Sequence, residues 1–283
     1  MKIMKYISLA LAVVLTVSCE KNMIEYNTTP LTDMAEFQLH YYAPVTAVTA
    51  NNINRVEVNG KMISNVKAPL ATYNVIPSGA VGRFYTSNPG NVNLKLYMTA
   101  KLEPKGDSLV YDQGVTLAVG KQNIYVHAFD QPPVIFDNGF PYIKRETVTT
   151  DSTAWIKFYN FLYETAGVPT DKIIQYQIID ARTSAPVNVG PPVAFGEATD
   201  WVQVTVVKTD IVSAGSRLYT FKMQEVSASG SIIGPLKIMN SAGTFVDYSA
   251  TATLFIGRRY HHTMAGFRAV KAPNSSVRVF TAL

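Results

Sequence analysis

The sequence contains two copies of one unit, and this internal repeat constrains the fold more than any other feature. Residues 116–121 (Thr-Leu-Ala-Val-Gly-Lys) recur as residues 253–258 (Thr-Leu-Phe-Ile-Gly-Arg), and residues 37–42 parallel residues 156–161. The copies are offset by 119 residues at the front and by 137 at the back, so the second carries about 18 extra residues. The repeat predicts two domains of one architecture, with longer loops in the second.

Short β-strands are predicted throughout both copies. Phe37, Leu39 and Tyr41 alternate with polar residues, which is the period of a strand with one buried face. Asn59 and Gly60 separate two further strand segments and favour a type I′ hairpin, because both residues tolerate positive φ. The shared glycine of the repeated ending predicts a tight turn between two strands. The sequence shows no long amphipathic helix. The pattern therefore predicts an all-β protein made of two β-sandwiches.

Composition supports this class of protein. With 283 residues, of which 47% are hydrophobic, the chain can bury a core in each of two domains. Only 16% of the residues are charged, whereas 16 tyrosines and 13 phenylalanines are present. This balance excludes general disorder and is typical of a β-rich extracellular protein.

The N-terminus predicts export. Lys2 and Lys5 precede an apolar run over residues 7–17, and the small Ser18 comes directly before Cys19. This is the pattern of a signal peptide, and the run is too short to cross a membrane as a helix.

Cys19 predicts lipid attachment. It is the only cysteine and lies where bacterial lipoprotein precursors are cleaved and acylated. Residues 15–19 resemble a lipobox, although Thr16 replaces the usual aliphatic residue. We expect acyl chains on Cys19 to hold the protein on a membrane, whereas the alternative is a secretory signal with an accidental cysteine.

The expected organisation has five parts. They are a signal peptide over residues 1–18, a lipidated tether over 19–34, β-sandwich domain 1 over 35–131, a linker over 132–152 and β-sandwich domain 2 over 153–283. Pro132, Pro133 and Pro141 stiffen the linker. Domains joined in this way predict two partly independent unfolding transitions, and a single transition would mean that they pack as one body.

A search for catalytic, cofactor and metal-binding patterns finds none, so we expect no enzyme, no cofactor and no metal site. His40 and His127 alternate with apolar residues on predicted strands and are expected to face solvent. His261 and His262 are adjacent, so they point to opposite faces of a strand and cannot both bind one metal ion.

Two further features also fail to indicate chemistry. Asp107 and Ser108 combine a carboxylate with a hydroxyl, but no histidine lies nearby in the sequence, so a hairpin turn is the preferred interpretation. Loss of Lys2 and Lys5 with the signal peptide lowers the formal net charge from +5 to +3, and no basic run remains. Nucleic-acid binding therefore has no support.

Aromatic residues give a weak indication of a contact surface. Trp155, Tyr159 and Tyr163 share one face of a predicted strand. Core packing accounts for at least one face of this strand, and an exposed face would stack on sugar rings or contact a protein. Trp155, Tyr159 and Trp201 are the candidate contact residues, with a core or sheet role as the alternative.

Cys19 in its lipobox-like context, the tandem units and their repeated ending resemble a family of Bacteroides-type outer-membrane lipoproteins with tandem immunoglobulin-like or transthyretin-like β domains. The resemblance covers most of residues 35–283. It implies two tandem immunoglobulin-like β-sandwich domains, a lipid anchor in the outer membrane and a position on the cell surface, with a periplasmic orientation as the alternative. No catalytic residue carries over, whereas O-glycosylation is implied at Ser108 and Ser152, each of which follows an aspartate.

We therefore expect a non-catalytic surface lipoprotein that acts as a binding or scaffold module for glycan or peptide ligands, as an accessory to an outer-membrane nutrient importer. The extra residues make the second copy the better candidate for contacts. The alternative is a fimbrillin-like or adhesive structural protein. Such a pilus subunit needs cleavage after Arg or Lys, but the tether offers only Lys21, and Arg55 lies in the predicted hairpin region. A secreted hydrolase would need an acid/base pair that we do not find.

Overall fold

The computed structural model describes residues 33–77, 83–99, 106–137, 153–180, 183–206, 215–271 and 275–282. In these ranges the chain forms β-strands and one short 3₁₀ turn, Thr49–Asn51, with no α-helix. The all-β sandwich class predicted from the sequence is therefore confirmed. Residues Asp33–Leu283 cluster into one compact unit, and the predicted signal peptide and Cys19 lie outside the described residues.

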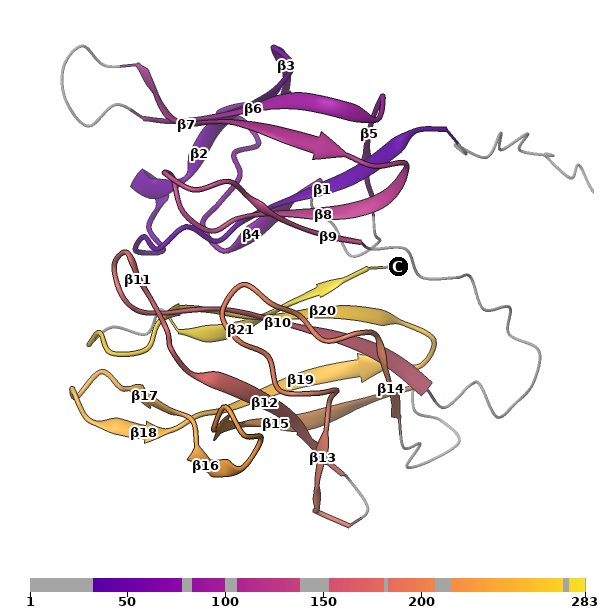
Figure 1. The fold of residues 1–283 in the computed structure, drawn as a ribbon, viewed down its shortest axis with the longest axis vertical. Helices are drawn as coiled ribbons and strands as arrows, with labels where there is room; N and C mark the ends of the chain where they lie inside the picture. Colours follow the sequence, from indigo (N-terminus) through magenta and orange to yellow (C-terminus); the bar gives the residue numbers. More distant parts are fainter. Residues whose placement is uncertain are drawn as a thin grey trace, which may run out of the picture. The chain divides into compact units, whose positions relative to one another are not determined.

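The first copy consists of two sheets, seen as layers in Figure 1. What we call its inner sheet has the order β4 (Asn74–Ile76), β1 (Ala35–Tyr41), β8 (Gly120–Val126) and β9 (Val134–Asp137), with β5 (Tyr85–Ser87) beside β1. Its outer sheet has the order β3 (Lys61–Ser64), β2 (Ile53–Val58), β6 (Gly90–Thr99) and β7 (Asp107–Leu117). Apolar residues of the two sheets pack together into one core, which includes Phe37, Leu39 and Leu96.

The second copy repeats this plan with one addition. Its inner sheet has the order β11 (Val168–Pro169), β10 (Thr153–Thr165), β20 (Arg259–Phe267) and β21 (Ser276–Thr281), with β14 (Val202–Thr205) beside β10. Its outer sheet has the order β13 (Pro186–Asn188), β12 (Ile173–Ile179), β15 (Ser216–Val226) and β16 (Ile232–Pro235), with β19 (Ser249–Phe255) also beside β15. A separate hairpin joins β17 (Lys237–Met239) to β18 (Phe245–Asp247).

The repeated ending has the same role in both copies. It leads into β8 or β20, which runs parallel to the first strand of its own copy, β1 or β10. Gly120 and Gly257 both adopt positive φ, +97° and +77°, as the turn predicted at each of them requires.

The extra residues of the second copy change the edge of its outer sheet. In the first copy, β7 runs beside β6 along 11 residues. In the second copy, β19 and β16 divide this position beside β15, and the β17–β18 hairpin lies between them in the sequence. The additional residues therefore form strands, whereas we expected them in loops.

Two local predictions have different outcomes. The Asn59-Gly60 turn joins β2 to β3 with φ of +50° and +75°, which confirms the hairpin. The turn expected at Asp107 and Ser108 is wrong, because pairing of β6 with β7 continues to the Thr99–Asp107 pair, so both residues begin β7. Ser108 is exposed there, and Ser152 lies outside the described residues.

The linker predicted over residues 132–152 begins with regular structure. Strand β9 lies within it and pairs with β8, which extends the inner sheet of the first copy. Residues 138–152 lie outside the described part of the chain.

The inner sheets of the two copies contact each other. A third apolar cluster joins Tyr42, Tyr73 and Tyr125 of the first copy to Tyr159 and Phe161 of the second. Every residue of β20 is buried, because one face of this strand covers its own core and the other lies in this contact. Burial on both faces is usual for sheets that contain parallel pairs. We call this contact the junction.

Candidate functional site

The four histidines of the chain lie in or near the junction. His40 and His261 are fully buried in it, and His262 points to the opposite face of β20 into the second core. The prediction that His40 faces solvent is wrong, because the outward face of β1 is covered by the second copy. His127 is half-buried, and its Nδ1 lies 3.2 Å from the Tyr163 hydroxyl.

A hydrogen-bond network crosses the junction at Asn123. Its Oδ1 lies 3.3 Å from His40 Nε2, and its Nδ2 lies 3.5 Å from His261 Nε2. The Nδ1 of His261 lies 2.7 Å from the hydroxyl of Tyr159. One consistent assignment has His40 donating to Asn123, Asn123 donating to His261, and His261 donating to Tyr159.

Burial keeps these imidazoles neutral. It lowers the pKa of His40 and of His262 to about 3, although the hydrogen bond with Asn123 acts in the opposite direction on His40. Burial also lowers the pKa of His261 far below its usual value, and nearby Lys157 adds to this effect. These enclosed, neutral imidazoles therefore belong to the packed interior, and they have no contact with solvent through which to reach a substrate.

Two of the three candidate contact aromatics, Tyr159 and Trp201, lie at the junction. Tyr159 is fully buried in the junction, so the core interpretation applies to it. Trp201 is half-buried with its ring centroid 5.0 Å from that of His261, and Trp155 is half-buried on β10. Within the described ranges, no three His, Cys, Asp or Glu side chains group as a metal site would require.

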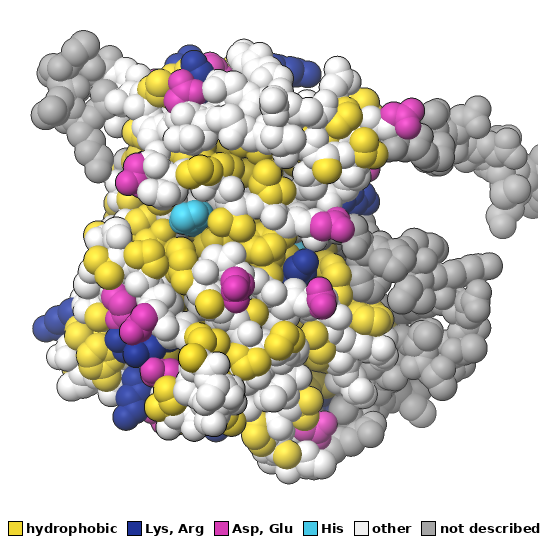
Figure 2. All heavy atoms as spheres, in the orientation of Figure 1, with side chains coloured by type: hydrophobic (Ala, Val, Ile, Leu, Met, Phe, Trp, Pro, Cys, Tyr) yellow, Lys and Arg dark blue, Asp and Glu magenta, His cyan; other side chains and the backbone are white. Residues whose placement is uncertain are grey.

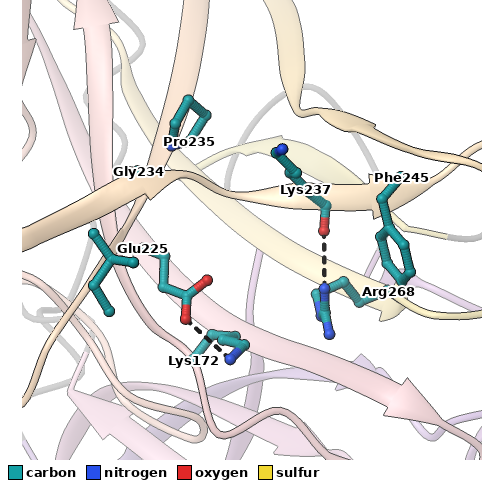
Figure 3. A pocket seen from close by; sticks show the side chains of 8 residues that line it. Lys172, Glu225, Gly234, Pro235, Lys237, Phe245 and Arg268 are labelled. Carbon is teal, nitrogen blue, oxygen red and sulfur yellow. Dashed lines mark hydrogen bonds and ion pairs between the residues drawn. The ribbon is translucent and has the colours of Figure 1, made fainter.

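An open groove of about 530 Å³ lies in the second copy, next to the added strands (Figure 3). Its lining residues come from five parts of the sequence: Lys172, Glu225, the β16 residues Ile233, Gly234 and Pro235, then Lys237 and Phe245 of the β17–β18 hairpin, and Arg268. Sequence reasoning missed this site because its residues are far apart in the chain. The one available signal was the extra length of the second copy.

Arg268 is the best-fixed side chain of the groove. Its Nε donates to both carboxylate oxygens of Glu164, at 2.7 and 2.8 Å, and its Nη1 donates to the Lys237 carbonyl at 3.2 Å. Thr170 donates to the same carboxylate at 2.6 Å. Burial acts to raise the pKa of Glu164, but the hydrogen bonds from Arg268 and Thr170 outweigh it, and the pKa is lowered.

Phe245 and Lys172 complete the walls. The Arg268 guanidinium lies 5.1 Å from the centroid of the Phe245 ring, and 44% of Phe245 is exposed. On the other side, Lys172 Nζ lies 2.9 Å from Glu225 Oε1 and 3.3 Å from Asp171 Oδ1. The hydrogen bond to Glu225 raises the pKa of Lys172. The groove therefore presents an exposed ring beside the paired Arg268, with the paired Lys172 and Glu225 on its other side (Figure 3).

A second hollow, of about 550 Å³, lies in the first copy at the edges of β3 and β5. Phe37, Val58 and Tyr85 line it, and these residues belong to the first core or pack against it. This hollow is a gap between the two sheets, and Lys61 is the one charged residue that lines it. The groove of the second copy is the better candidate site.

On the face drawn in Figure 2, acidic and basic side chains lie interspersed and are not gathered by sign. In the described portion of the chain, no helix has the length and apolar character that crossing a bilayer requires.

Comparisons with known proteins add little to this geometry. No family model matches the chain, and no curated protein matches it. Among solved structures, the crystal structure of a "putative adhesin" from Bacteroides ovatus is similar at 9% identity, covering 87% of this chain and 95% of that chain, with a TM-score of 0.19. A score this low does not establish a shared fold, so the lipoprotein family suggested by the sequence stays a prediction.

Proposed function

We propose that this chain is a non-catalytic, lipid-anchored protein of the outer membrane that acts at the cell surface as a binding or scaffold module. The observation that carries the proposal is the groove, because β16 and the added β17–β18 hairpin present an exposed ring beside fixed charges on the second copy. Residues Ile233, Gly234, Lys237 and Phe245 of these strands line the groove, where they are available for contacts.

The arrangement of titratable groups supports binding over catalysis. The three fully buried histidines lie in the junction and the second core, and Arg268 and Lys172 of the groove are paired with carboxylates. These pairs fix the shape of the groove without an acid or base whose pKa is shifted toward neutrality, which proton transfer would need.

The proposed partners follow from this role. Acyl chains on Cys19 would hold the protein on the membrane, and an outer-membrane nutrient importer would be the protein partner, with glycan or peptide as the bound ligand. Purification of the tagged chain from its own membranes in mild detergent, followed by mass spectrometry, tests this. We expect a transporter in stoichiometric amount with the wild type, and its loss with Cys19→Ala.

Other outcomes contradict the proposal in different ways. Detergent-resistant polymers of the chain itself would support the fimbrillin-like or adhesive alternative. A lone monomer from both wild type and Cys19→Ala would contradict the scaffold role. Resistance to protease added to intact cells would contradict the surface position and support a periplasmic one.

A further inference from the structure

We infer that the groove of the second copy binds a neutral saccharide, with Phe245 as the ring on which a sugar stacks. This inference rests on the proposed binding function and adds the class of ligand. Three properties of the groove favour this ligand: the support of the ring, the pairing of the charges and the blocked edge of β16.

Phe245 is a supported aromatic platform. It lies on β18 opposite Met239 of β17, and Arg268 lies beside its ring in Figure 3. Because Glu164 and the Lys237 carbonyl hold Arg268, the ring has a fixed neighbour although it is exposed. The face of an aromatic ring carries partial negative charge, so it attracts the partly positive C–H groups on the apolar face of a sugar.

Two of the three cations that line the groove are paired with carboxylates. Lys172 pairs with Asp171 and Glu225, and Arg268 pairs with Glu164. An anionic ligand would compete with carboxylates that already hold two of the cations, which favours a ligand without net charge. Hydroxyl groups both donate and accept hydrogen bonds, so a polyhydroxylated molecule matches ammonium donors and carboxylate acceptors together. A hollow of about 530 Å³ is in the size range of sites for small ligands.

An extended peptide fits this place less well. The Leu236 N–H donates to Met223 of β15, so the neighbouring residue, Pro235, presents its backbone nitrogen to the free edge of β16. Proline has no N–H, so the free edge lacks a donor that an added strand would use. Strand addition is therefore disfavoured along the wall of the groove.

Saturation-transfer NMR on the detergent-solubilised full chain tests the inference, with cellotriose, maltotriose and chitotriose as neutral probes and trigalacturonate as an anionic one. We expect at least one neutral trisaccharide to bind more tightly than trigalacturonate. Phe245→Ala should weaken that binding by about tenfold or more, and Phe245→Trp should retain it. Leu218→Ala, on the exposed face of β15 at 63% exposure, is the matched control and should bind as the wild type does.

Three results would overturn the inference. They are no binding of any neutral probe at millimolar concentration, preferential binding of trigalacturonate, and wild-type affinity in a Phe245→Ala variant whose circular dichroism is unchanged. None of these results affects co-purification with a transporter, which tests the proposed function separately. The saccharide assignment can therefore fail while the proposed function holds.

Discussion

The junction and the groove use similar residue types with opposite effects. At the junction, Tyr125 stacks on Phe161 with ring centroids 4.9 Å apart, and the nearby imidazoles are enclosed. In the groove, Phe245 lies beside a guanidinium but is half-exposed, and its charged neighbours reach solvent. Burial therefore decides whether an aromatic and polar cluster stabilises the fold or is available to a ligand.

The two copies share their buried layers and differ at an exposed edge. Their cores and their central parallel pairs are alike, and both contribute one face to the junction. They differ at the edge of the outer sheet, where β7 is continuous and its counterpart is divided into β16 and β19, with the β17–β18 hairpin between them in the sequence. A sheet edge accepts such an addition because few core contacts are lost there. The difference teaches that the shared fold belongs to the inner layers and the specific chemistry to an edge.

Acid should have the largest effect, and it should act on the junction and on the second core. His40 and His262 have folded-state pKa values of about 3, and His261 is also lowered, so below pH 6.5 the unfolded state binds more protons. Stability is therefore lost as pH falls, by roughly 2 kcal/mol per imidazole between pH 7 and pH 5, or about 6 kcal/mol for the three. Urea unfolding at these two pH values measures the loss.

A matched pair of variants locates this effect. His261→Asn should reduce the acid-induced loss by about one third, whereas His127→Asn should reduce it little, because His127 is only half-buried. Equal free energies of unfolding at pH 7 and pH 5 in the wild type would contradict the assignment of neutral, enclosed imidazoles.

Truncating the junction should have the next largest effect. Phe161 is fully buried and packs against Tyr125, Phe136 and Tyr42 of the first copy. Phe161→Ala should lower the free energy of unfolding by about 3–5 kcal/mol, through lost transfer energy and the cavity left behind. Chemical denaturation at pH 7 measures this directly.

Calorimetry provides the control for that variant. With the junction intact, the wild type should unfold in one transition, because the inner sheets share an apolar cluster. Loss of Phe161 should separate the transition into two. Two transitions in the wild type would show that the junction is too weak to couple the copies.

The same substitution in the groove should have the smallest effect on stability. Phe245→Ala removes an equal side chain from a position that is 44% exposed, so it should change the free energy of unfolding by about 1 kcal/mol or less. Chemical denaturation of Phe245→Ala and Phe161→Ala under the same conditions measures the difference between their free energies of unfolding. A loss as large as that of Phe161→Ala would mean that Phe245 serves the fold, and the contrast between the two regions would fail.

Local chemistry explains what could be predicted from the sequence. The hairpin at Asn59 and Gly60 and the turns at Gly120 and Gly257 need positive φ, and few residues accept it. The period of two along residues 37–41 depends only on neighbouring residues, so the strands and the repeat were visible without a structure. The all-β class follows from these short-range preferences.

Only the tertiary structure decided what covers each strand. Alternation of residues separates the two faces of β1 but does not state that a second sheet covers the outward one. The prediction that His40 faces solvent was therefore wrong, and Tyr159 could not be assigned to either the core or a contact surface. The groove also depends on long-range placement, since Lys172 and Glu225 meet only after β12 has paired with β15, and Arg268 reaches them only when the two sheets of the copy have packed. Contacts between residues far apart in the chain follow from packing, which neither propensity nor period encodes.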